Sequence, residues 1–129
     1  MSLRQIGMTD NSDPKQTFLY KLSEKPGLEW FKHIVLLSSY QDQYAPFDSA
    51  RIQICSMATK DTERGSVYIQ MATNLLNKLE IECLYRVDIN FMISEKNLDS
   101  FIGRTAHIQF LENKFYMNML LFRFKELFD

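Results

Sequence analysis

The feature that most constrains this chain is a continuous apolar run, Ile34–Leu37, set between polar and turn-forming residues. A run of this kind suits a strand that is buried on both faces of a parallel sheet. In open α/β sheets, the loops that follow the carboxyl ends of the strands carry the chemistry. Asp42 comes directly after the expected strand, and it is therefore a candidate functional residue.

A second strand is expected at 83–91, where CLYRVDINF alternates apolar and polar side chains. Alternation with a period of two indicates a strand with one poorly buried face, as at the edge of a sheet. Helical patterns fill the stretch between the two strands, so the connection is a crossover and the strands, at about 33–39 and 83–91, are parallel. Two strands are too few for a self-sufficient parallel sheet. We therefore interpret the chain as the end of a larger α/β sheet.

Four to five helices are expected around these strands, after an irregular lead-in over residues 1–12. Asp and Pro at positions 13 and 14 indicate a helix start, and a Pro-Gly pair at 26–27 ends that helix. The last helix is apolar over more than half of its circumference, so we expect it to be largely buried. The expected ranges are about 13–26, 28–32, 48–60, 66–79 and 112–128.

The composition is that of an ordinary globular protein, and it argues against nucleic acid as a partner and against a membrane span. Its 129 residues fit one domain, here a single partial domain over residues 1–129, and 46% of them are hydrophobic. The net charge of -1 lacks the basic excess of a nucleic-acid binder. No run approaches the roughly 18 apolar residues of a membrane span, and the N-terminal stretch MSLRQIGMTD lacks the apolar run that a signal peptide needs.

The two cysteines, Cys55 and Cys83, stand alone, without a CxxC pair or a Cys/His cluster at metal-ligand spacing. Isolated thiols of this kind fit a reducing compartment, which predicts a cytoplasmic protein. A single disulfide is the alternative interpretation. We expect no metal and no cofactor.

Asp42 and His107 form the most specific candidate pair, because each follows an expected strand. In Ser-His-Asp hydrolysis, the acid orients the imidazole, which removes the proton from the nucleophile and later donates it to the leaving group. In α/β-hydrolases the chain order is Ser, Asp, His, and the order of these two residues agrees with it. From spacing alone two alternatives stay open: Asp42 as a loop or capping residue, and His107 as a structural histidine.

The nucleophile is missing from this sequence. A G-x-S-x-G elbow needs glycines because the backbone turns sharply and packs closely there. Ser38 and Ser39 have no flanking glycine, and Ser66 is better explained as a helix cap. The chain alone therefore lacks the parts for acyl transfer. None of the four glycines brackets a serine: Gly7, Gly27, Gly65 and Gly103.

Three separated blocks of this sequence resemble one known family. They are DPKQTFLYKLSEKPGLEWFKHIVLL, SSYQDQYAPFDSARIQIC and LDSFIGRTAHIQFL, in this order. The first two resemble the segment around a Q-D-x-Y-x-P motif in the putative serine esterase (lipase-like) domain, an α/β-hydrolase. The third resembles the stretch around the final histidine of that family.

The resemblance implies that Ile34–Ser39 is the seventh strand and 83–91 the eighth strand of a hydrolase sheet, with Asp42 as triad acid and His107 as base. The first six strands and the nucleophile elbow have no counterpart. The chain is thus expected to be the C-terminal part of a carboxylic-ester or lipid hydrolase, inactive alone. The alternative is a non-catalytic interaction or scaffold module that retains this end of the fold. In either case we expect a homodimer, or a swapped assembly, that covers the open sheet edge and part of the Phe-rich last helix.

Overall fold

The computed structural model describes residues 2–91 and 99–128. Contacts divide the chain into two compact units, each made of two stretches. The first unit combines Met1–Ile34 with Ile52–Tyr85, and the second combines Val35–Arg51 with Arg86–Asp129. The organisation as a single partial domain stays a prediction. None of the helices within the described ranges has both the length and the apolar character to cross a bilayer.

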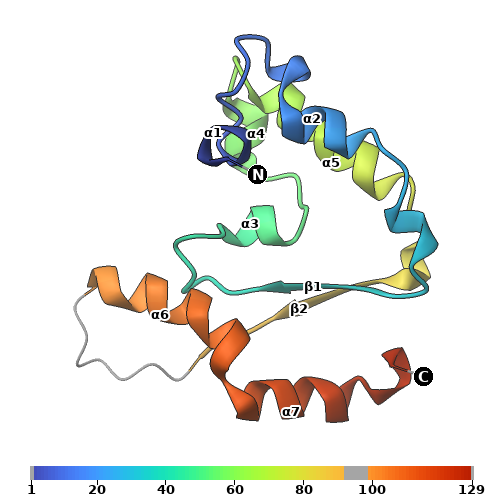
Figure 1. Ribbon diagram of the computed structural model, residues 1–129, viewed down its shortest axis with the longest axis vertical. Helices are drawn as coiled ribbons and strands as arrows, with labels where there is room; N and C mark the ends of the chain where they lie inside the picture. Colours follow the sequence, from blue (N-terminus) through green and yellow to red (C-terminus); the bar gives the residue numbers. More distant parts are fainter. Residues whose placement is uncertain (1, 92–98, 129) are drawn as a thin grey trace. The chain divides into compact units, whose positions relative to one another are not determined.

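The sheet has two parallel strands, β1 (Ile34–Ser38) and β2 (Leu84–Asp88), which lie side by side (Figure 1). Two parallel strands in an α/β fold are thus confirmed, and both strands are shorter than expected. Alternation along β2 is also confirmed, since Tyr85 and Val87 are half-buried while Arg86 is exposed.

The prediction that β1 is buried on both faces is wrong. All four residues of the apolar run are half-buried, and only Ser38 at the strand's end is buried. Among the described residues, β2 is the sole strand that pairs with β1. A two-stranded sheet shields each strand along one edge, which leaves part of its side chains accessible to water.

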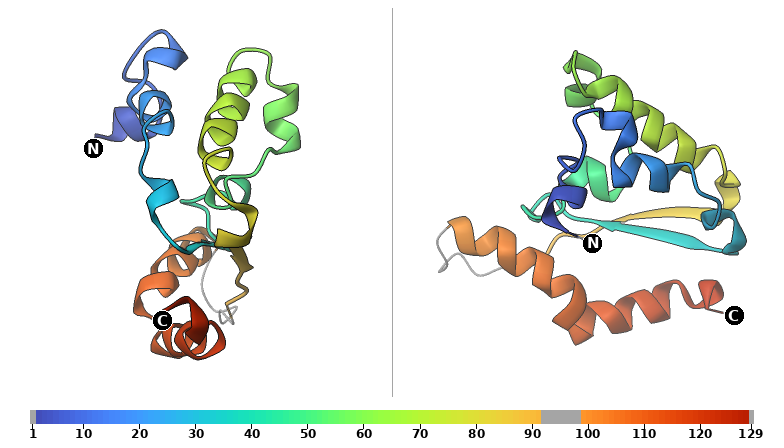
Figure 2. Two further views of the ribbon diagram at one scale, coloured as in Figure 1. Left: turned by 90° about the vertical axis from the view of Figure 1, so that its right-hand side faces the viewer. Right: turned by 45° about the horizontal axis from the view of Figure 1, so that its top comes forward.

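In the first unit, α5 (Gly65–Leu76) packs against α2 (Phe18–Ser23) and α4 (Ser56–Lys60), and Figure 2 shows α2 and α5 side by side. The helix predicted from the apolar stripe at 66–79 is confirmed as α5. Lys78 donates hydrogen bonds to the carbonyl oxygens of Ser23 and Lys25, at 2.9 and 2.8 Å. These bonds satisfy carbonyl groups that the end of α2 leaves without a helical partner.

Gly65 sets how closely α4 approaches α5. A Cβ atom at this position would lie 1.9 Å from the carbonyl oxygen of Ala58. Both residues are buried, and a backbone oxygen cannot yield as a flexible side chain can. Only glycine therefore permits this packing.

Local backbone conformations overturn two expectations, the irregular lead-in and the single helix at 48–60. The lead-in over residues 1–12 contains α1 (Leu3–Ile6), which a capping box between Ser2 and Gln5 begins. The helix expected at 48–60 is instead two helices, α3 (Phe47–Ala50) and α4. Ile52 lies between them with a left-handed φ of 49°, a conformation that interrupts a helix.

The segment expected as one helix from 13 to 26 is also divided. Asp13 caps the 3-10 helix η1 (Pro14–Gln16) by accepting a hydrogen bond from the Lys15 N–H at 2.9 Å, which confirms it as a cap. The helix α2 begins only after Thr17, whose extended backbone ends η1. Two further 3-10 helices, η2 (Leu28–Trp30) and η3 (Ile81–Cys83), precede the two strands.

The prediction for the C-terminal helix is wrong both in where the helix starts and in how much of it is buried. Residues 102–107, expected to connect to that helix, belong to α6 (Asp99–Glu112), and α7 (Lys114–Arg123) and η4 (Lys125–Leu127) follow. Asn113 separates α6 from α7, and it caps α7 by accepting a hydrogen bond from the Tyr116 N–H at 3.1 Å. The polar stretch SEKNLDS at 94–100 predicts a loop. Residues 94–98 lie outside the described residues, and Asp99 and Ser100 belong to α6 instead. Much of the apolar surface of α7 is exposed rather than buried.

The core of the second unit forms around Phe91, Ala106 and Tyr116. The ring of Phe91 contacts the rings of Phe110 and Tyr116 edge to face, with centroids 5.0 and 5.6 Å apart. Burial raises the pKa of Tyr116 to about 12. This cluster attaches α6 and α7 to the segment that follows β2, and so it determines where the side chains of α6 lie.

Candidate functional site

Asp42 lies in the turn after the carboxyl end of β1, where its carboxylate is held by backbone groups. One oxygen, Oδ1, accepts hydrogen bonds from the N–H groups of Tyr44 and Ala45 at 2.8 and 3.0 Å. The Asp42 N–H itself donates to the carbonyl oxygen of Ser39 at 3.2 Å. Such side-chain bonds to following N–H groups are typical of aspartate in turns. The capping role left open for Asp42 is therefore present, and it uses only one carboxylate oxygen.

The other carboxylate oxygen contacts His107. Oδ2 of Asp42 lies 2.8 Å from Nδ1 of His107, which α6 presents to it. The Asp42 side chain is 3% exposed, whereas the imidazole is 48% exposed. Within the described part of the chain, nothing forms a hydrogen bond with Nε2 of the ring. The pair thus has a buried acid, an oriented imidazole and an accessible second ring nitrogen.

Two opposing effects set the pKa of Asp42. Burial raises it, because the charged form loses hydration. Hydrogen bonds from the Ala45 N–H, from His107 and from the Tyr44 N–H stabilise the charged form, and together they hold the pKa of Asp42 below its ordinary value. The carboxylate is therefore ionised at neutral pH. Since an ionised carboxylate only accepts, Nδ1 of His107 carries the hydrogen and donates it.

Gln41 joins the loop after β1 to the segment after β2. Its side-chain amide donates to the carbonyl oxygen of Phe91 at 2.9 Å and accepts from the Phe91 N–H at 2.7 Å. Phe91 in turn packs against Phe110, which follows His107 by about one turn of α6. Gln41 therefore fixes the positions of both members of the pair: Asp42 as its neighbour in the chain, and His107 through the aromatic contact.

A second set of contacts attaches the C-terminal end of the loop after β1 to the end of β2. Asp88, the last residue of β2, accepts a hydrogen bond from the Ser38 hydroxyl at 2.8 Å and forms an ion pair with Arg51. Arg51 also lies over the ring of Phe47, 5.1 Å from its centroid, and that ring stacks on Tyr40 at 3.5 Å. The segment between Tyr40 and Arg51 is thus attached to the sheet at both of its ends, with Asp42 between them.

A pocket of about 340 Å³ opens beside the pair. It combines polar groups at the end of β1 with apolar groups from the loop and from α6. The ring of Tyr44 lies 5.6 Å from that of His107, beside the pocket. Its lining consists of Leu37, Ser38, Ser39, Asp42, Ala45, Ala50, His107, Phe110 and Leu111.

Neither serine in this pocket is placed as a nucleophile. Ser38 and Ser39 are each 1% exposed. The Ser38 hydroxyl donates to Asp88, and the Ser39 hydroxyl accepts a hydrogen bond from the Gln41 N–H at 3.1 Å. Both hydroxyl groups therefore form hydrogen bonds that stabilise the end of β1 and the turn after it.

Sequence reasoning selected Asp42 and His107, and the structure brings the two together. It missed Gln41 and Asp88, which hold the loop in place. For Gln41, the available signal was its position next to Asp42 in the motif. For Asp88, the sequence offered only an outward-facing polar residue, because its partners depend on how the strands pair. No group of three metal-ligating side chains occurs within the part of the chain that the structure describes.

Fold and site define the class: an α/β protein with a buried Asp–His pair after the carboxyl end of a parallel strand. Residues 1–57 match the sequence model of the family described as putative serine esterase. The resemblance seen in the sequence motifs is thereby confirmed for this segment. The matched range includes Asp42 and ends before His107, so it does not extend to the third motif block. No solved structure matches the chain.

Proposed function

We propose that Asp42 and His107 are the acid and the base of a serine-esterase proton relay, whose nucleophile this sequence does not supply. The observation that supports the proposal is the 2.8 Å contact between Oδ2 and Nδ1 on an imidazole that is 48% exposed. The match of residues 1–57 to a serine esterase family agrees with this chemistry.

In this relay, Nε2 of His107 removes the proton from a serine hydroxyl as that oxygen attacks the ester carbonyl. The imidazolium then donates this proton to the departing alcohol, and the acyl group stays on the serine until water releases it. Asp42 keeps the hydrogen on Nδ1 and stabilises the imidazolium while it is charged. The apolar part of the pocket suits the acyl portion of a carboxylic ester, which favours a lipid-like substrate.

The test uses a longer protein that contains this chain together with an upstream serine nucleophile. Asp42→Asn and His107→Ala should each lower kcat for a short p-nitrophenyl ester by about 10³- to 10⁴-fold. Asp48→Asn is the matched control, since Asp48 belongs to α3 in the same loop and does not line the pocket. Loss of the same size in the control, or full activity after either change of the pair, would contradict the relay.

The 129-residue chain by itself should not hydrolyse p-nitrophenyl esters through this pair. Any slow release of p-nitrophenol should equal that of the His107→Ala variant, because an imidazole without a positioned nucleophile adds little. A rate that depends on His107 in the isolated chain would show that a nucleophile is present after all.

A second candidate is a non-catalytic interaction module, which the exposed apolar residues of α7 favour. Phe115 and Phe122 are 82% and 90% exposed, and exposed apolar patches often mark contact surfaces. We infer a homodimer that covers these side chains and the unpaired edge of β1. If this is the sole function, changes at α7 abolish the biological activity while changes at Asp42 and His107 leave it intact.

We also infer that the protein is cytoplasmic. Both cysteines are free thiols, as is usual where glutathione keeps thiols reduced. Fractionation of cells that produce the tagged protein tests this location, and recovery from a secreted fraction would contradict it.

A further inference from the structure

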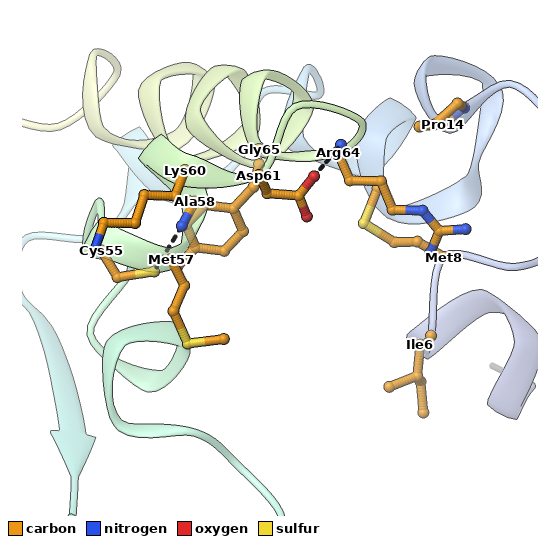
Figure 3. A pocket seen from close by; sticks show the side chains of 12 residues that line it. Ile6, Met8, Pro14, Cys55, Met57, Ala58, Lys60, Asp61, Arg64 and Gly65 are labelled. Atoms are coloured by element: carbon orange, nitrogen blue, oxygen red, sulfur yellow. Dashed lines mark hydrogen bonds between the residues drawn. The ribbon is translucent and has the colours of Figure 1, made fainter.

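The first unit contains a pocket of about 600 Å³, distinct from the Asp–His site and independent of the function proposed for it. Its size falls within the range of small-molecule sites. Figure 3 shows Met57 and Ala58 from α4 on one side of the opening, with Ile6 and Met8 on the other. Its walls are mainly apolar, and charged side chains occur only along 60–64. The lining consists of Ile6, Gly7, Met8, Pro14, Cys55, Met57, Ala58, Lys60, Asp61, Arg64, Gly65 and Tyr68.

The backbone around this pocket is tightly determined. Gly65 allows the start of α5 to contact Ala58, as described above. Asp61 holds the turn that leads into α5, since its Oδ1 accepts hydrogen bonds from the N–H groups of Glu63 and Arg64, each at 2.8 Å. The carboxylate of Asp61 is thus bound to the protein's own backbone. The wall that α4 and α5 form is therefore preorganised in the absence of a ligand.

Met8 forms part of the opposite wall in a strained conformation. Its φ is 52°, in the left-handed region that glycine and asparagine occupy more readily. The turn is held by hydrogen bonds from the Gly7 and Thr9 N–H groups to the carbonyl oxygens of Leu3 and Arg4, at 2.9 and 2.8 Å. Strain of this kind often occurs at ligand sites, and here it adds a methionine side chain to the pocket.

Two cations of the lining form no side-chain hydrogen bond or ion pair in the described ranges. Neither the Lys60 ammonium nor the Arg64 guanidinium forms a hydrogen bond or an ion pair with a described residue. In Figure 3 they extend on either side of Asp61, whose own carboxylate binds backbone N–H groups. Backbone hydrogen bonds from Arg64 and Glu63 and, to a smaller extent, the charge of Arg64 lower the pKa of Asp61. The charged edge of the pocket therefore carries one more positive than negative charge.

We propose that this pocket binds an amphiphilic carboxylate, with its alkyl chain against Ile6, Met8 and Met57 and its carboxylate bound by Lys60 or Arg64 at the charged edge. Flexible, polarisable methionine side chains adapt to alkyl chains of varying shape. The arginine fork and the lysine ammonium both bind carboxylates. Apolar walls with a cationic edge select an anion that carries a tail, and they disfavour a cation with the same tail.

The test titrates the ¹⁵N-labelled 129-residue protein with dodecanoate, kept below its micelle-forming concentration, and follows amide shifts by NMR. Saturable shifts are expected at residues 6–8 and 55–68. Acetate, which has the same head without a tail, should produce none. Dodecyltrimethylammonium, which has the same tail with the opposite charge, should bind several-fold more weakly than dodecanoate.

Variants assign the binding to the named side chains. Lys60→Glu with Arg64→Glu should weaken dodecanoate binding by about fivefold or more, because two favourable charges become repulsive. Met57→Asp, at a side chain that is 79% exposed, should weaken it without disturbing the fold. Lys21→Glu, at an exposed position of α2 outside the lining, is the matched control and should leave the affinity unchanged.

Four results would overturn the proposal. The first is the absence of saturable binding, and the second is amide shifts that map outside this pocket. The third is an affinity for dodecanoate that the charge reversals leave unchanged, and the fourth is an equal affinity for the cationic amphiphile. Either of the last two would indicate adsorption to exposed apolar surface. The outcome is independent of the esterase relay, because no residue of this pocket belongs to the Asp–His site.

Discussion

The carboxylate of Asp42 and the imidazole of His107 meet at 2.8 Å although 65 positions of the sequence separate them. Asp42 comes from the turn after β1, and His107 comes from α6. The contact depends on the pairing of β1 with β2 and on the aromatic core that attaches α6. It can therefore be tested through stability as well as through activity.

Asp42→Asn should lower the free energy of unfolding at neutral pH by about 1–3 kcal/mol, because a buried, hydrogen-bonded charge is lost. The folded-state pKa of Asp42 lies below its unfolded value, so its contribution is present above about pH 4 and is lost as pH falls through the folded pKa. The difference in the free energy of unfolding between wild type and Asp42→Asn should therefore become smaller in acid.

Urea unfolding followed by circular dichroism, at neutral pH and near pH 3, measures this difference. Asp48→Asn should change the free energy of unfolding by less than about 0.5 kcal/mol at both values. A gap between wild type and Asp42→Asn that stays constant in acid would argue that ionisation of Asp42 does not stabilise the fold.

Gln41→Ala should destabilise the protein and loosen the Asp–His contact. The change removes both hydrogen bonds to the backbone of Phe91, at a cost of about 1–3 kcal/mol. Gln43→Ala is the matched control, since Gln43 is exposed in the same loop and forms no hydrogen bond with a described residue. Urea unfolding measures the stability, and the NMR signal of the His107 Nδ1–H reports the contact. Equal behaviour of the two variants would show that the amide bridge is unimportant.

Gly65→Ala should destabilise the first unit by about 3 kcal/mol. The added Cβ would lie 1.9 Å from the Ala58 carbonyl oxygen, so the two helices must move apart. Gly7→Ala provides the comparison, because its Cβ would lie 3.3 Å from the Leu3 carbonyl oxygen at an ordinary φ of -80°. Its cost should stay below about 1 kcal/mol. Thermal unfolding of both variants checks the difference, and a small effect at Gly65 would mean that α4 and α5 pack less closely.

Phe115→Ser combined with Phe122→Ser should shift the protein from dimer to monomer. Both side chains are largely exposed, so the change should spare the fold of each unit while it removes apolar area from a contact. Light scattering coupled to size-exclusion chromatography gives the mass, and Lys114→Ser on the same helix is the control. A wild-type protein that is already monomeric at high concentration would contradict the dimer.

Local patterns were sufficient where one short-range effect dominates. The run Ile34–Leu37 predicted β1, the alternation at 83–91 predicted β2, and the spaced apolar stripe at 66–79 predicted α5. Asp42 was selected because it directly follows the predicted strand, which is again a short-range feature of the sequence. Where two local preferences compete, the patterns failed. The backbone turns at Ile52 and divides the helix expected at 48–60, and α6 forms before Asn113, where the apolar spacing predicted no helix.

The sequence by itself determined the two strands, the crossover between them and the two polar side chains worth testing. It did so because hydrophobic periodicity and turn chemistry act between near neighbours. Only the tertiary structure decided that Nδ1 of His107 meets Oδ2 of Asp42, that Gln41 bridges to Phe91, and that α7 is exposed. These are contacts between distant segments, and their geometry depends on how strands pair and helices pack rather than on the order of residues.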